Sequence, residues 1–343
     1  SIGLVVHDAV HGFESVRSLE KMQAFLYEHE PVMAKALEAF EVLDYGCLRG
    51  YSHNIARGWS ADRWALVGEA GAFVDPLYSP GSDFIAFANS FTEEMIRVDR
   101  AGGDLEARSR ELNILYRSLV NGNVDLFRGA ADIYGHASAM LTKVYWDNFS
   151  YWSYPCQIFL QGMFRLTGDE LAKVIPIGQR FVQLSQYVQK ILAAWAKLAP
   201  EEPVPGFRGM PAFPSVLIDA HLALRDKRTP DETVAYMQSR LVEGEEIVAE
   251  IVLRVLDAVG EEKLDALVEE AGVKEFVLSI PEERLDAVGS IGLARRKVLR
   301  PLAKDVERTL GKPAGNLSRA SFVCVLGHVI KAAPAQMQGE SAQ

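Results

Sequence analysis

One segment of the chain, residues 64–92, combines residue types that suit the binding of a ligand. It reads as a short apolar strand, a turn of small residues and a helix, with glycines along the turn. Glu69 follows the strand closely, where its carboxylate can accept hydrogen bonds from ligand hydroxyls. Glycines keep such a turn free of bulk, so that the backbone can approach a ligand closely. The candidate binding residues are Gly68, Glu69, Ala70, Gly71, Asp75, Pro76, Ser79, Gly81 and Ser82.

The order of these residues resembles the second FAD-binding motif of the para-hydroxybenzoate-hydroxylase-like flavoproteins, and most closely its form in flavin-dependent halogenases. That motif runs approximately G-D-A-A-G-F-x-D-P-x-x-S-x-G, and residues 68–81 read G-E-A-G-A-F-V-D-P-L-Y-S-P-G. The resemblance implies bound FAD, with Glu69 at the ribityl hydroxyls and the helix after Gly81 directed at the flavin ring. The positive end of that helix would stabilise the negative charge that develops on reduced flavin. Weaker support extends to the strand at residues 51–56 and to the aromatic segment near Trp146.

The same resemblance implies an FAD-dependent oxidoreductase of the monooxygenase or halogenase kind, acting on a small organic, aromatic substrate. In such enzymes reduced flavin reacts with O₂ to a C4a-hydroperoxide, and a flavin reductase or NAD(P)H supplies the electrons. It assigns no catalytic residue within this chain. Two alternatives stay open. One is a flavin dehydrogenase or reductase of the geranylgeranyl-reductase kind, and the other is a cofactor-free helical binding protein.

The chain departs from the family pattern at several points. Pro80 has no N–H where the family uses backbone amides to hold a halide, and Asp83 adds negative charge nearby. These two residues predict that halide use is weak or absent. The sequence contains neither the GxGxxG fingerprint, which binds the pyrophosphate of FAD, nor the WxWxIP sequence of halogenases. Because the chain also begins with an apolar strand, we expect it to be the C-terminal part of such an enzyme and to hold FAD weakly by itself.

An aromatic run at residues 145–154 is the candidate wall of a substrate site, through Trp146, Tyr151 and Trp152. Packing between helices explains such a run equally well. His7 and His11 lie four residues apart but have no third ligand in view, so we expect no metal site.

The elements that must position these residues predict an α/β flavoprotein fragment: a few strands followed by a mainly α-helical C-terminal region. Strands are expected at residues 2–6, 51–59 and 64–67, and the loop from Gly68 to Gly81 should lead into a helix near Ser82. We expect the end of the FAD and substrate domains at residues 1–100, a helical region at 101–335 and a disordered tail at 336–343. Further helices are predicted at residues 18–40, 105–120, 124–141, 177–198, 229–251, 264–270, 281–310 and 318–331, with a linker at 200–214. Pro31 should open a second helix within residues 18–40, and Thr229 and Glu232 should form a capping box. The helix near Ser82 should carry one apolar face, made of Phe84, Phe87, Phe91, Met95 and Val98.

Composition narrows the possible partners. The formal net charge of −10 disfavours nucleic acid, because phosphates would be repelled by most of the surface. No apolar run approaches the roughly 20 residues that cross a bilayer, so no membrane partner is expected. The chain has three widely spaced cysteines, an odd number without a CxxC pair, which fits a reducing cytoplasm.

Overall fold

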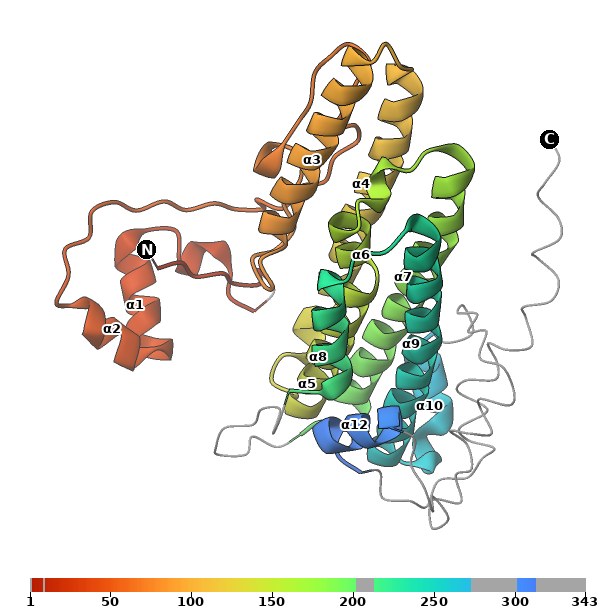
Figure 1. Ribbon diagram of the computed structural model, residues 1–343. Coiled ribbons are helices and arrows are strands. Elements are labelled where there is room, and N and C mark those ends of the chain that lie inside the picture. Colours follow the sequence, from red (N-terminus) through yellow and green to blue (C-terminus); the bar gives the residue numbers. More distant parts are fainter. Residues whose placement is uncertain (1, 9, 202–212, 273–300, 313–343) are drawn as a thin grey trace. The chain divides into compact units, whose positions relative to one another are not determined.

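The computed structural model describes residues 2–8, 10–201, 213–272 and 301–312, and these are mainly α-helical (Figure 1). The contacts divide the chain into two compact units, Ser1–His53 and Asn54–Gln343. Several predicted features lie outside the described residues. These are the helix at 318–331, the tail, and most of the linker at 200–214 and of the helix at 281–310.

The predicted strands at residues 2–6, 51–59 and 64–67 are wrong. Among the described residues no strand forms, and the extended segments make isolated bridges, one of them an antiparallel bridge between Trp59 and Ala65. The amide of Leu66 donates to the carbonyl of Gly58 at 2.8 Å, and the amide of Ser60 donates to that of Trp64 at 3.2 Å. Short apolar runs indicate burial as much as strand structure, and a strand needs a neighbour to pair with. The predicted α/β class is therefore corrected to a mainly α-helical structure.

The first unit contains two short helices, α1 (Leu19–His29) and α2 (Pro31–Leu37), after the 3₁₀ turn η1 (Phe13–Ser15). The side chain of Ser18 caps α1 by accepting a hydrogen bond from the amide of Lys21. Pro31 opens α2, as its fixed φ favours, and the predicted break within residues 18–40 is confirmed.

The second unit begins with a helix pair, α3 (Pro80–Arg100) and α4 (Leu105–Phe127), which pack against each other. The buried face of α3 carries four large side chains spaced three or four residues apart, as the sequence predicts: Phe84, Phe87, Phe91 and Met95. The 3₁₀ turn η2 (Gly68–Ala70) lies against α3, so the predicted flavin loop rests on this helix.

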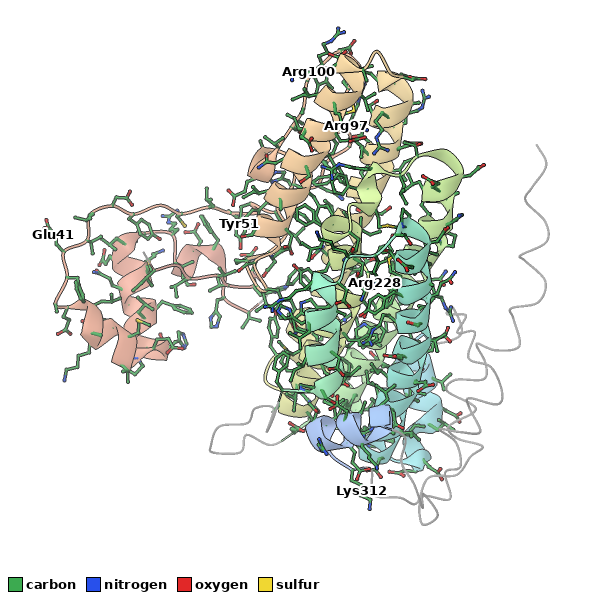
Figure 2. The ribbon with its side chains drawn as sticks, in the orientation of Figure 1. Glu41, Tyr51, Arg97, Arg100, Arg228 and Lys312 are labelled. Atoms are coloured by element: carbon green, nitrogen blue, oxygen red, sulfur yellow. The ribbon has the colours of Figure 1, made fainter. Side chains whose placement is uncertain are left out.

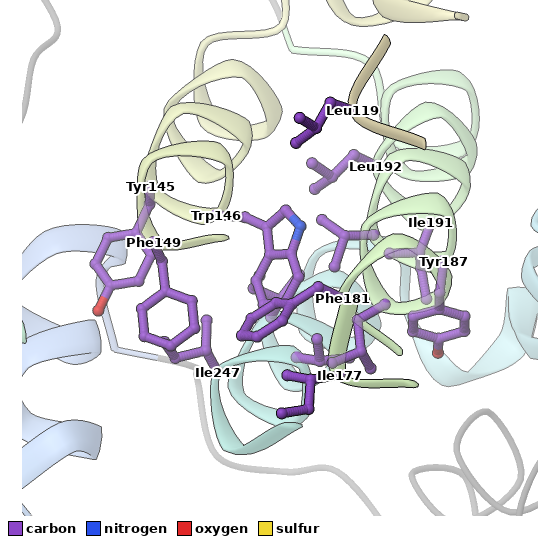
Figure 3. Close-up of a cluster of buried hydrophobic side chains, with 14 of the residues drawn as sticks. Leu119, Tyr145, Trp146, Phe149, Ile177, Phe181, Tyr187, Ile191, Leu192 and Ile247 are labelled. Atoms are coloured by element: carbon purple, nitrogen blue, oxygen red, sulfur yellow. The ribbon is translucent and has the colours of Figure 1, made fainter. Parts of the chain in front are cut away.

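The core of the second unit is built from α5 (Ala137–Ser153), α7 (Gly168–Leu198) and α9 (Pro230–Val259). Figure 3 shows Trp146 of α5 in the middle of this core, with apolar side chains of α7 and α9 around it. Every residue of α9 from Gly244 to Leu256 is buried, so this part of the helix has no exposed face. Shorter elements complete the unit: η3 (Ala130–Ile133), α6 (Pro155–Leu160), η4 (Met163–Arg165), α8 (Ser215–Leu222), η5 (Ala223–Arg225), η6 (Glu261–Lys263), α10 (Leu264–Glu270) and α12 (Pro301–Leu310).

Helix ends follow local signals in most cases. The capping box predicted at Thr229 and Glu232 is confirmed, because each side chain binds the other residue's backbone amide. The predicted helix at residues 124–141 is wrong. Its first residues continue α4 and its last belong to α5, and Gly129 and Gly135 between them have positive φ. No described helix is both long and apolar enough to span a bilayer.

Candidate functional site

The approach to the predicted flavin loop is anchored by Trp59. Its side chain is buried, its ring packs against Phe91 and Tyr116, and its indole N–H donates to Thr92 Oγ1 at 3.0 Å. Asn113 of α4 binds the same backbone. Its Oδ1 accepts hydrogen bonds from the amides of Gly58 (2.6 Å) and Trp59 (3.2 Å). The start of the loop is therefore fixed to both α3 and α4.

The glycines of the loop differ in what the fold requires of them. Gly68 has a φ of 61°, in the left-handed region that favours glycine. A Cβ added at Gly71 would lie 3.3 Å from the carbonyl oxygens of both Gly68 and Leu66, so backbone crowding explains this glycine. A Cβ added at Gly81, in the first turn of α3, would meet no atom within 4 Å. Nothing in the described fold requires glycine at position 81.

The remaining predicted binding residues lie along the surface of the loop. Asp75 is half-buried and shapes the turn, because its Oδ1 accepts a hydrogen bond from the amide of Leu77 at 2.8 Å. The side chains of five predicted residues are exposed: Glu69, Ala70, Pro76, Ser79 and Ser82. The loop thus presents a carboxylate and two hydroxyls to its surroundings.

The helix α3 begins without a side-chain cap. Ser79 is the N-cap residue, but its side chain makes no capping hydrogen bond, and Pro80 follows at the first helical position. Tyr78 and Ser79 both have left-handed backbone conformations, with φ of 64° and 56°. The predicted start of the helix near Ser82 is two residues late, because proline at the first position is itself a start signal. The positive end of α3 is available to a group outside the chain.

One hydrogen bond joins this junction to α5. The hydroxyl of Tyr151 donates to Asp83 Oδ1 at 2.9 Å. Burial raises the pKa of Asp83, and the hydrogen bond from Tyr151 opposes this shift. Burial, together with the charge of Asp147, raises the pKa of Tyr78.

Asp147 lies in a buried polar network. Lys143 is fully buried, and its Nζ lies 2.7 Å from Asp147 Oδ2. The same nitrogen donates to the carbonyl of Leu126 and to Gln189 Oε1, each at 2.7 Å, and Gln189 Nε2 donates to Asp147 Oδ1 at 3.0 Å. Lys143 and the hydrogen bond from Gln189 offset part of the lost hydration, but burial outweighs them and raises the pKa of Asp147.

The three predicted substrate-wall residues lie in different surroundings. Trp146 has no exposed surface, and its indole N–H donates to Ser185 Oγ at 3.1 Å, so packing accounts for it. The half-buried ring of Trp152 packs against His221 and Phe213. Only Tyr151 of the three is exposed and bound to the helix that carries the flavin loop.

Sequence reasoning missed Tyr78, Asn113, Lys143 and Asp147 as parts of this site. Tyr78 lies inside the recognised motif, but the motif assigns it no role. Asn113 binds the backbone before the loop from α4, and Lys143 and Asp147 belong to α5. All three lie far along the chain from the motif and carry no local signal. Among the described residues no cluster of three or more histidine, cysteine or acidic side chains could hold a metal ion.

Comparison with known proteins supports the resemblance at the level of the superfamily. The chain is 26% identical over 155 residues to the flavin-dependent halogenase chlA of Dictyostelium discoideum, a match that covers 45% of this chain. It spans about a quarter of that relative's length, since the match covers 26% of the halogenase. No protein-family model matches the chain, and no solved structure is similar to it.

Proposed function

We propose that this chain supplies a flavin-contacting loop to an FAD-dependent oxidoreductase, a monooxygenase-like enzyme that acts on an organic, aromatic substrate. The observation that carries the proposal is Gly81, which the fold leaves without neighbours in the first turn of α3. A glycine that the chain's own packing does not require is explained by a ligand that approaches the backbone there. The similarity to a flavin-dependent halogenase supports flavin as that ligand.

The chemical groups of the loop suit the ribityl chain and the ring of FAD. The exposed carboxylate of Glu69 can accept hydrogen bonds from ribityl hydroxyls. The uncapped N-terminus of α3 can stabilise negative charge on the ring. When bound, flavin would supply the redox chemistry and the reaction with O₂. The chain's contribution would be to hold and orient it and to place Tyr151 beside the substrate.

The start of α3 favours oxygen transfer over halogenation. Pro80 occupies the first helical position and has no N–H with which to bind an anion. Asp83 lies in the first turn and presents a carboxylate there. A halide at this helix end would therefore meet one donor fewer and one like charge more.

Flavin binding can be tested with FMN, which carries the ring and ribityl chain of FAD but lacks its pyrophosphate. We expect FMN to shift the amide resonances of Gly68, Gly71 and Gly81 in a chain labelled with ¹⁵N-glycine. Gly102 and Gly103, at the far end of α3, serve as internal controls. Selective labelling reports weak binding residue by residue, so a low affinity does not obscure the result.

Two variants separate a specific site from general adsorption. Gly81→Ala should fold normally, because the added methyl meets nothing within 4 Å, yet it should weaken the FMN-induced shifts. Glu69→Ala should weaken FMN binding by about tenfold or more, since a hydrogen bond to a charged group contributes about 1.5–3 kcal/mol. The proposal is wrong if millimolar FMN leaves the loop glycines unshifted, or if Gly81→Ala binds FMN as well as the unmodified chain.

A further inference from the structure

One face of α5 carries three polar residues at successive four-residue steps, Lys143, Asp147 and Tyr151. The hydroxyl of Tyr151 donates to Asp83 Oδ1 at 2.9 Å, just after the start of α3. Just before that start, Tyr78 interacts electrostatically with Asp147. Lys143, one turn earlier on α5, forms an ion pair with Asp147 in which Lys143 Nζ lies 2.7 Å from Asp147 Oδ2.

The backbone between these two contacts is strained. Tyr78 and Ser79 are adjacent residues with a side chain, and both have positive φ. Such conformations are unfavourable for residues with a side chain and persist only where the surrounding structure enforces them. The Ser79 side chain offers no help, because it makes no hydrogen bond to the helix. The Tyr151–Asp83 hydrogen bond lies a few residues after the strained pair.

We propose that this face of α5 is a positioning element for the flavin loop, with Tyr78 and Tyr151 as positioning residues. The hydrogen bond from Tyr151 to Asp83, together with the interaction of Tyr78 with Asp147, holds the left-handed Tyr78–Ser79 pair and thereby aims the N-terminus of α3 and Gly81 at the ligand. The benefit of this positioning rests on the proposed flavin function, whereas the positioning itself depends only on contacts within the chain. It predicts that the loop loosens locally while the helical core stays intact.

Tyr78→Phe and Tyr151→Phe remove one hydroxyl each and keep the ring. Hydrogen exchange should be measured at the amides of Ser79 and Ser82, which donate to the carbonyls of Pro76 (3.0 Å) and Ser79 (3.2 Å) across the strained pair. We expect exchange at both amides to rise by about tenfold or more in each variant, and FMN affinity to fall alongside it. The amide of Gly71, bonded to the carbonyl of Gly68 at 3.0 Å, is the reference within the same loop.

Tyr27→Phe is the matched control, because it removes a hydroxyl–carboxylate bond (2.6 Å to Glu38 Oε1) in the other unit. It should change neither Ser79 nor Ser82. A rescue experiment separates the effect of backbone strain from a general loss of packing. Asparagine tolerates the left-handed conformation better than serine does. Ser79→Asn should therefore restore slow exchange in the Tyr78→Phe background, which a general loss of packing would not allow.

The outcomes separate the two proposals. Unchanged exchange at Ser79 and Ser82 in both tyrosine variants, or failure of Ser79→Asn to restore it, overturns the positioning role. Faster exchange in a chain whose glycines do not respond to FMN supports the positioning role and refutes the flavin function.

Discussion

Glu94→Gln tests how a buried carboxylate fixes the helix that carries the flavin loop. Glu94 of α3 is fully buried, and Arg97 donates to both of its oxygens at 2.8 and 2.9 Å. Figure 2 shows Arg97 near the far end of α3. Arg108 of α4, almost as buried, lies with its Nε 3.3 Å from Glu94 Oε1. The pair thus ties α3 to α4 at a point where neither side chain is hydrated.

The size of the effect follows from what remains after the substitution. Removing one partner of a buried ion pair costs about 3–5 kcal/mol, because the other charge stays buried. Arg108 would keep Glu111 at 2.8 Å and the carbonyl oxygen of Leu166 at 3.0 Å, and glutamine keeps one acceptor. We therefore expect the low end of that range, about 3 kcal/mol.

Urea unfolding followed by tryptophan fluorescence measures this loss at neutral pH. Glu93→Gln is the matched control, since Glu93 is exposed and its pair with Arg165 (2.9 Å) should contribute only about 0–1 kcal/mol. Similar destabilisation by the two variants would refute the argument from burial.

The pH dependence gives a second check on Glu94. Burial raises its pKa, but the hydrogen bond from Arg97 and the charges of Arg108 and Arg97 outweigh this and lower it below the ordinary value of 4.5. A carboxyl with a lowered pKa contributes stability above its unfolded pKa and loses it as pH falls through the folded pKa. The unmodified chain should lose stability below about pH 4.5 more steeply than Glu94→Gln does.

Two further substitutions test the helical core. Asp305 of α12 caps the start of α8, because it accepts hydrogen bonds from the Ser215 amide and hydroxyl (each 2.8 Å) and from the Val216 amide (3.1 Å). Asp305→Ala should therefore lower the free energy of unfolding by about 2 kcal/mol, as measured by thermal unfolding. The exposed Lys304→Ala, on the same helix, should change stability little, and equal losses would contradict the capping role. Gly178→Ala should destabilise by about 1–3 kcal/mol, because its Cβ would lie 2.2 Å from the Tyr154 hydroxyl, whereas Gly122→Ala, with its nearest neighbour at 3.8 Å, should be neutral or stabilising. Chemical denaturation of both glycine variants decides this, and a tolerant Gly178→Ala would show that Tyr154 can move aside.

Features encoded by neighbouring residues could be predicted from the sequence. Pro31, the Thr229–Glu232 capping box and the spacing of Phe84, Phe87 and Phe91 each specify a helix start or a buried face within a few residues. The strands could not be predicted in this way, since Trp64–Val67 is extended but has no ladder within the described chain. Only part of the candidate site could be predicted from the sequence. The motif identified the loop, but the side chains that hold the loop in place come from other parts of the chain. Asn113 is 55 residues from Gly58, and no local pattern marks such a partner.

The enclosed stretch of α9 limits how this protein can change over evolutionary time. Most helices have an outward stripe where substitutions accumulate almost without consequence. The stretch from Gly244 to Leu256 has no such exposed stripe. Its buried charged side chains include an ion pair, in which Glu250 and Arg254 lie 2.9 Å apart. A change at any of these positions disturbs a neighbour, so compensating changes on α5, α7 or α12 must accompany it. Sequence variation will therefore be accommodated more readily in the exposed loop before α3 than in this part of α9.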